Sequence, residues 1–350
     1  MLGRVTPAHG SQRAQRRATT MSDVATLAGV SQQTVSRVVN GSGYVGGTTR
    51  ERVRTAMRKL NYRPNAAAKA LVTGRTNTLG VVTLDTVAYG PASVLLGLDR
   101  TARAHGYAVS VARLDDLDGD SLVHAIEQLQ RQRVEGILLN AGRRGMAAEL
   151  DHIEVNVPLV AVEDTADAAV PVVHVDEVAG ARAATGLLLD LGHRTVAHIA
   201  GPRDWSSTRN RSGGWRAALE SAGAAVVPPL FGDWSVHSGY ELGRRLAQDS
   251  ELTAVFAAND EMALGAMRAL FEAGRALPGD VSVVGFDDVP FARYLTPSLT
   301  TVRQDFDAIG RRSLELLLNA IRDEDDAPVH AAITPELTVR ESTAPAPTRN

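Results

Sequence analysis

Cysteine is absent from this 350-residue chain. No run of apolar residues approaches the roughly 20 that a transmembrane helix needs. The first absence excludes disulfides and thiolate metal sites. Residues 1–19 contain Arg and Gly but lack the apolar segment of a secretion signal. We therefore expect a cytoplasmic protein that makes no contact with a membrane. We also expect 1–19 to be a disordered basic tail, with Met21 as an alternative start.

The common catalytic motifs are missing as well. The sequence has no Gly-x-Ser-x-Gly elbow, no P-loop and no evident pair of catalytic carboxylates. The segment 41–46 fits G-x-G-x-x-G but follows a predicted helix instead of a strand, so we read it as a loop. The segment 116–127 has its glycine and glutamate at the wrong positions for a calcium loop. The sequence thus predicts a protein that is not an enzyme and has no cofactor and no metal.

Positive charge is concentrated at the N-terminus. Residues 1–75 hold thirteen Lys and Arg against two acidic residues, a net charge of +11. The whole chain carries −3, which leaves −14 for the remainder. A basic region joined to an acidic body is typical of a phosphate-contacting region attached to a sensing domain.

Residues 20–63 read as two short helices around a tight turn, followed by a third helix. Gly29 permits the left-handed backbone at the end of the first helix, and Ser31 is a natural N-cap for the second. Val35 faces inward from the second helix. The outer face then carries Gln32, Gln33, Ser36 and Arg37. Gln pairs with adenine and Arg with guanine, so the pattern predicts a helix-turn-helix whose second helix enters a major groove.

A third helix is predicted from Arg50 to Leu60, and Pro64 ends this region. Asn65 can cap a further short helix that Gly74 ends, so we assign 64–75 as a hinge helix. A helix this short and alanine-rich does not hold in water alone. We expect it to fold against a partner helix and DNA.

From Thr78 onward, apolar strands alternate with helices. Strands are predicted near residues 79–84, 107–111, 136–139, 158–162, 195–200, 253–257 and 281–285. Helices are predicted near residues 92–105, 121–132, 178–191, 210–222, 237–247 and 260–273. Continuous apolar strands separated by helices indicate parallel sheets covered on both faces. The predicted fold is a two-lobed α/β body, residues 76–342, with a ligand cleft at the carboxyl ends of the strands. Residues 343–350 are expected to be a flexible tail.

The segment Asp23–Asn40, together with Asn61–Asn65, closely resembles the headpiece of the lactose repressor (LacI/GalR) family. Ala258–Ala266 and Ser282–Asp288 resemble the family's core, and the resemblance runs from Thr20 to about Ser342. It implies an all-α helix-turn-helix headpiece with a hinge helix, and a periplasmic-binding-protein-like effector domain that also dimerises. It further implies a transcriptional repressor of a carbohydrate-utilisation operon that binds palindromic operator DNA. A small, galactoside-like sugar would release it.

The resemblance also implies which residues contact DNA. They are Ser31, Gln32, Gln33, Thr34, Ser36, Arg37, Asn40, Tyr62, Asn65, Lys69 and Leu71. Leu71 matches a family leucine that wedges into the minor groove, its alternative being a packing contact of the hinge helix. Lys69 stands where the family often has Arg or Gln, and it loses the bidentate contact with phosphate.

The effector-binding residues implied in the same way are Glu163, Arg211, Trp234, Asn259, Asp287, Gln304 and Phe306. Their chemistry agrees, because Asn259 and Asp287 directly follow predicted strands. Carboxylate, guanidinium and amide groups can fork onto adjacent hydroxyls, and an indole can stack on a sugar. Taken singly, Trp234 also fits a core aromatic, Asp287 and Asn259 fit loop caps, and Arg211 fits a surface ion pair.

A single recognition helix binds weakly, so we expect a homodimer on two half-sites. The segment 89–93 and the helix after it match the family's dimer-facing surface. The Pro-rich C-terminus cannot form a leucine-heptad coil, so a tetramer is not expected. Two alternatives share the two-lobed body: a sugar-binding transport protein and a sugar-processing enzyme. The identity of the sugar and the direction of its effect on DNA binding are not set by the sequence, although the resemblance favours weakening.

Overall fold

The computed structural model describes residues 19–41, 43–63, 70–71, 73–84, 88–114, 119–140, 142, 150, 153–162, 170–322 and 330–348. The chain divides into two compact units, residues 1–76 and 77–350. Each unit is a separate body with its own core, as expected for a head joined to a larger sensing domain.

The first unit is built on helices α1 (Met21–Ala28), α2 (Gln32–Asn40) and α3 (Gly47–Lys59). They enclose a small apolar core of Val24, Ala25, Ala28, Val35, Val53 and Ala56. Thr20 begins α1 through a capping box with Asp23. Gly29 ends α1 at φ +61°, where an added Cβ would lie 2.9 Å from Arg52 Nη2. The predicted helix-turn-helix is confirmed, with α3 beginning three residues earlier than Arg50.

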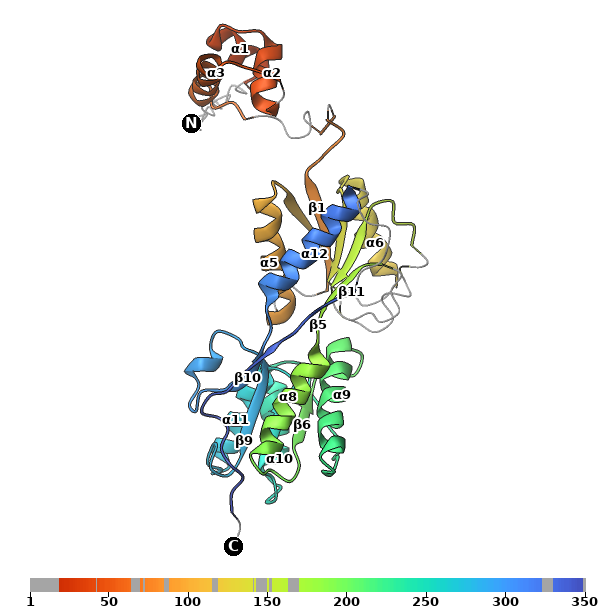
Figure 1. The fold of residues 1–350 in the computed structure, drawn as a ribbon, viewed down its shortest axis with the longest axis vertical. Coiled ribbons are helices and arrows are strands. Elements are labelled where there is room, and N and C mark those ends of the chain that lie inside the picture. Colours follow the sequence, from red (N-terminus) through yellow and green to blue (C-terminus); the bar gives the residue numbers. More distant parts are fainter. Residues whose placement is uncertain are drawn as a thin grey trace, which may run out of the picture. The chain divides into compact units, whose positions relative to one another are not determined.

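The first sheet of the second unit has the strand order β11-β5-β4-β3-β1-β2. All of its pairings are parallel. Its strands are β1 (Thr78–Thr83), β2 (Ala108–Arg113), β3 (Ile137–Asn140), β4 (Leu159–Val162), β5 (Val172–Val175) and β11 (His330–Ile333). Helices α5 (Tyr89–Ala104) and α12 (Phe306–Ile321) pack together on one face, and α6 (Gly119–Arg131) covers the other (Figure 1).

The second sheet has the order β12-β10-β9-β8-β6-β7 and is parallel except for the β10–β12 pair. Its strands are β6 (Ala197–Ala200), β7 (Leu230–Phe231), β8 (Ala254–Ala257), β9 (Ser282–Asp287), β10 (Thr300–Arg303) and β12 (Glu336–Thr338). One face is covered by α8 (Glu177–Asp190) and α9 (Ser206–Ser221), the other by α10 (Val236–Leu246) and α11 (Asp260–Glu272). A 3-10 turn, Ala292–Tyr294, follows β9.

The chain crosses between the two lobes at three places, because β5 leads to α8, β10 leads to α12, and β11 leads to β12. Helix α12 therefore packs on the first lobe although it follows a strand of the second. These crossings put Glu177, Gln304 and Phe306 on the segments that join the lobes. The arrangement positions a binding site between two parallel sheets.

Several elements were not predicted from the sequence: β5, β7, β10, β11, β12 and α12. The predicted flexible tail from residue 343 is wrong at its start. The Ala346 amide donates to the Leu191 carbonyl at 2.8 Å, and the Ala344 carbonyl accepts from Ser282 Oγ at 3.2 Å. These bonds fasten the segment along the second lobe. Among the described helices, none is long and apolar enough to cross a membrane.

Candidate functional site

The outer face of α2 presents side chains that are free to meet a ligand. Gln32, Gln33 and Arg37 are exposed, and within the described residues their side chains make no hydrogen bond or ion pair. Val35, on the opposite face, is fully buried in the head core. The helix therefore separates a packed side from an open polar side, as a groove-reading helix requires.

Other predicted DNA-contact residues already have local partners. Ser31 caps α2 by accepting from the Thr34 amide at 3.1 Å, and the two hydroxyls lie 2.9 Å apart. Ser36 Oγ accepts from Asn40 Nδ2 at 3.2 Å. Tyr62 is half-buried and packs against the head core. These contacts fix the ends of the recognition helix and the exit of the chain from α3.

Of the predicted hinge contacts, only Leu71 lies in the described part of the chain. Its side chain is 81% exposed. The turn that carries it ends at Gly74, whose amide donates to the Ala70 carbonyl at 2.9 Å at φ +70°. Asn65 and Lys69 lie outside the described residues. An exposed leucine at this position is compatible with either expected role, a groove wedge or a packing contact.

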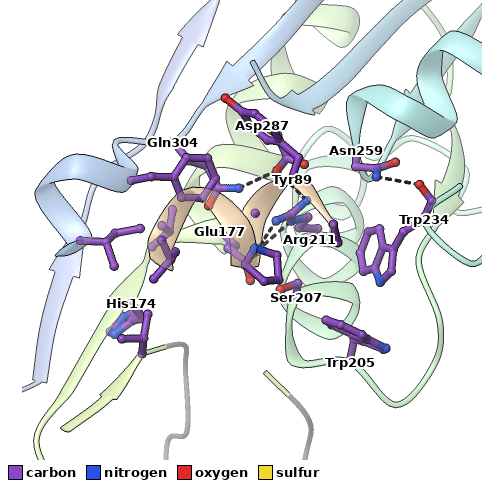
Figure 2. Close-up of a pocket in the computed structure, with 18 of the residues that line it drawn as sticks. Tyr89, His174, Glu177, Trp205, Ser207, Arg211, Trp234, Asn259, Asp287 and Gln304 are labelled. Atoms are coloured by element: carbon purple, nitrogen blue, oxygen red, sulfur yellow. Dashed lines mark hydrogen bonds and ion pairs between the residues drawn. The ribbon is translucent and has the colours of Figure 1, made fainter. Parts of the chain in front are cut away.

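A cavity that opens to solvent lies between the two lobes of the second unit. Segments that meet there include the start of α5, the end of β5, the starts of α8 and α9, and the β10–α12 crossing. Its polar and aromatic lining residues include Tyr89, His174, Glu177, Trp205, Ser207, Arg211, Trp234, Asn259, Glu261, Asp287, Gln304 and Phe306. Figure 2 shows two indoles at one end of the cavity, His174 at the other, and the charged groups between them.

Arg211 organises the charged centre of this pocket. Its Nε and Nη2 donate to Glu177 Oε1 at 2.9 and 2.7 Å, and Nη1 lies 3.3 Å from Asp287 Oδ1. All three residues are buried, with exposed fractions of 6–8%. The guanidinium also lies over the Phe286 ring, 4.0 Å from its centroid. A buried charge is tolerated only with such partners, so these groups hold one another in place.

The pKa values of two carboxyl groups in the pocket are raised toward neutral pH. Burial raises the pKa of Asp287 to about 6, although Arg211 and a hydrogen bond from Gln304 Nε2 at 2.6 Å act in the opposite direction. Burial, assisted by the charge of Asp287, raises the pKa of Glu261 to about 7. Near pH 7 the pocket therefore offers Glu261 in both protonation states and Asp287 mainly as a hydrogen-bond acceptor.

Asn259 and Trp234 form a second linked pair. The Asn259 side chain caps α11 by accepting from the Met262 amide at 2.9 Å. Its Nδ2 donates to the Trp234 carbonyl at 3.0 Å and to Glu261 Oε2 at 2.8 Å. The indole Nε1 of Trp234 is buried without a hydrogen-bond partner among the described residues. Gly201 lies against the ring, where an added Cβ would be 2.2 Å from Trp234 Cζ2, so only glycine fits behind it.

The structure brings most of the predicted effector residues together. Those that line the one cavity are Arg211, Trp234, Asn259, Asp287, Gln304 and Phe306. Glu163 lies outside the described residues. Tyr89, which begins the segment expected to face the dimer partner, lines the pocket and meets the Phe306 ring edge-to-face at 5.7 Å. No group of three His, Asp or Glu in the described chain could hold a metal ion.

Several residues that line the cavity were not predicted from the sequence. These are His174, Glu177, Trp205, Ser207 and Glu261. Glu177 precedes by one residue the helix predicted from 178, and Trp205 follows β6 at its carboxyl end. The rule that ligands bind at the carboxyl ends of parallel strands, applied to β6, would have found Trp205.

Comparison with known proteins agrees with this geometry. Residues 20–65 match the family described as bacterial regulatory proteins, lacI family, and residues 185–343 match a periplasmic binding protein-like domain. The lactose operon repressor of Escherichia coli K12 is 35% identical over 85% of this chain and 84% of its own length. The transcriptional regulator CelR of Thermobifida fusca is 37% identical, covering 94% of this chain and 99% of that protein.

Solved structures give the same result. The crystal structure of the Lac repressor dimer bound to operator and the anti-inducer ONPF superposes with a TM-score of 0.86 and 32% identity. It covers 94% of this chain and 100% of that one. A CelR–cellobiose complex superposes at 0.70 with 35% identity, covering 93% and 99%. The fold and site define a two-part regulator with a DNA-reading head and a ligand-binding body. The chain belongs to the lacI family of bacterial regulatory proteins.

Proposed function

We propose that this protein represses a carbohydrate-utilisation operon by binding a palindromic operator as a homodimer, and that a small sugar releases it. The observation that carries the proposal is the pocket between the lobes, where Asp287, Arg211 and Asn259 converge beside the Trp234 indole. Carboxylate, guanidinium and amide groups pair with vicinal hydroxyls, and an indole face suits the C–H face of a pyranose.

The DNA-reading part follows from the free outer face of α2. One recognition helix reaches only a few base edges, so a twofold dimer on two half-sites supplies the missing affinity and predicts a symmetric operator. Gln32, Gln33 and Arg37 are the base-reading residues in this proposal, and Leu71 enters the minor groove at the centre.

The choice of a sugar is supported by the relatives. One of them is a lactose operon repressor, and another was solved with cellobiose. A galactoside is our first candidate, and a different plant-derived oligosaccharide is the second. Sugar bound between the lobes biases their arrangement and separates the hinge helices. Coupling between two such sites is typically about 1–3 kcal/mol, or roughly 5–150-fold in affinity.

The operator half of the proposal is tested by selecting duplexes from a random pool with the full-length protein. We expect a symmetric site to be enriched, with an affinity that falls steeply as salt rises because phosphate contacts release counterions. A protein that shows no preference for any symmetric sequence over random fragments, at any ionic strength, contradicts the proposal.

The sugar half is tested on the selected operator with Asp287→Asn, which keeps the shape of the side chain and removes its charge. We expect the wild type to be released by one member of a panel of sugars, and the variant to bind operator equally well without responding. Asp249→Asn, on the exposed turn after α10, is the matched control and should respond as the wild type does. A normal response from Asp287→Asn shows that the site is wrongly assigned.

A further inference from the structure

Trp205 is an aromatic residue of the pocket that the charged centre does not use. It lines the cavity from the N-cap position of α9, directly after the loop that follows β6. The next residue, Ser206, donates its amide to the Gly142 carbonyl of the first lobe at 3.0 Å. Trp205 is thus held at the junction of the two lobes.

The two indoles of the pocket meet at a corner. The ring centroids of Trp205 and Trp234 lie 6.0 Å apart, and their planes are inclined by 78°. Figure 2 shows Trp205 beside Trp234, at the same end of the cavity. A pyranose stacks with its C–H face parallel to an aromatic ring. Because the two planes are almost perpendicular, a single pyranose face cannot stack on both indoles.

Arg211 and Asn259, two of the polar groups of the pocket, lie beside Trp234. Asn259 is bonded to the Trp234 carbonyl, and Arg211 lies 5.6 Å from the Trp234 ring centroid. Hydroxyl-reading groups therefore surround a ring stacked on Trp234. The hydrogen bonds that the structure gives to Trp205 are those of its backbone in the turn that begins α9. Its side chain offers an apolar stacking face, and Ser207 of the same helix lies beside it in the cavity (Figure 2).

The two stacking faces at this corner agree with a ligand of more than one ring. Resting on the proposed function, we propose that the effector is a disaccharide or longer. One pyranose stacks on Trp234 and is read by Asp287 and Asn259. The adjoining pyranose stacks on Trp205, which selects for chain length.

The experiment titrates the full-length protein with lactose, cellobiose, maltose and melibiose, and with galactose and glucose alone, by calorimetry. We expect at least one disaccharide to bind about tenfold or more tightly than either monosaccharide, which is roughly 1.4 kcal/mol. Trp205→Ala should remove that advantage and leave monosaccharide affinity within about twofold, whereas Trp205→Phe should keep most of it because a phenyl ring still stacks.

Fluorescence gives a second readout, since the chain has three tryptophans and Trp215 is fully buried in the core of the second lobe. In Trp234→Phe, the remaining signal from Trp205 should respond to disaccharides and not to monosaccharides. Operator binding, which neither substitution should alter, establishes that the variants are folded.

Two results overturn the inference alone: a monosaccharide that binds as tightly as every disaccharide, or a Trp205→Ala variant that weakens both classes equally. If no sugar in the panel binds the protein while operator binding is intact, the sugar effector itself is wrong and the proposed function fails with it.

Discussion

The two units use their polar side chains in opposite ways. On α2 of the head, Gln32, Gln33 and Arg37 are exposed and without partners among the described residues. In the body, Arg211 is buried and held by Glu177 and Asp287. In the proposed function, the head keeps its base-reading groups free before DNA binds, whereas the body holds its polar groups in place without a ligand.

This difference has an energetic meaning. Free side chains lose rotamer entropy on binding, about 0.5–1.5 kcal/mol for each long one, but they can adapt to several base edges. Prepaired groups lose little more on binding and are therefore selective for one ligand shape. Buried ions destabilise the fold unless they have partners, so the fold must provide these partners whether or not a ligand is bound.

The largest expected effect therefore lies in the body. Arg211→Ala leaves the Glu177 and Asp287 carboxylates buried without their cation, which we expect to lower the free energy of unfolding by about 3–5 kcal/mol. Urea unfolding of the full-length protein, followed by the fluorescence of buried Trp215, measures it.

The matched control is Arg303→Ala, which breaks an ion pair with Glu336 whose side chains are 58% and 69% exposed. An exposed pair contributes about 0–1 kcal/mol, so this variant should unfold almost as the wild type does. Equal losses from the two arginines would mean that the buried cluster is not prepaired, and the contrast between head and body would fail.

The next effect lies in the head. Arg37→Ala removes a proposed base-reading group whose side chain is exposed, so we expect little change in stability but a loss of about 1–3 kcal/mol in operator affinity. The loss should be accompanied by relaxed specificity at one base pair of each half-site, as measured by binding to operators with single substitutions.

Arg58→Ala, on the exposed face of α3 and paired with Glu51, serves as its control. Any effect there should be equal on operator and random DNA, because a phosphate contact carries no sequence information. If Arg37→Ala weakens binding to operator and to random DNA equally, Arg37 contacts phosphate, and Gln32 and Gln33 are the base-reading residues.

The head could be predicted from the sequence almost completely because its determinants are local. Ser31 caps α2 through the next turn, Gly29 has the left-handed backbone that the turn needs, and Val35 is buried by helical spacing. Each of these depends on neighbours within a few residues. In the body, strands flanked by clear helices, such as β8 and β9, were equally readable.

The parts of the body that were missed depend on distant contacts. Strand β10 and helix α12 are consecutive but belong to different lobes, which no local periodicity reveals. The short β5 and β11 pair with each other across 158 residues or so of chain, as in Val172 with His330. Likewise, Arg211 was predicted as a ligand contact, but its partner Glu177 comes from another helix and appears only in three dimensions.

The smallest expected effect is a pH dependence of the body alone. Burial raises the pKa of Glu261 to about 7, above its ordinary value of 4.5, so the folded state binds this proton more tightly than the unfolded state. The resulting stability is complete below about pH 4.5 and is lost as pH rises through 7. Buried His198, whose pKa is lowered to about 4, has the opposite sign, but its contribution is already constant above about pH 6.5.

In the window from pH 6.5 to 8, Glu261 contributes together with two groups of the same sign: Asp287, whose pKa is raised to about 6, and Asp260, whose pKa burial raises well above its ordinary value. In urea unfolding across this window, the wild type should lose stability with rising pH, and Glu261→Gln should reduce the slope. Glu220→Gln, at the exposed end of α9, should leave it unchanged. A slope that Glu261→Gln does not alter would mean that this carboxyl group is exposed to solvent. The polar groups of the pocket would then resemble the exposed side chains of α2, and the contrast between body and head would be smaller.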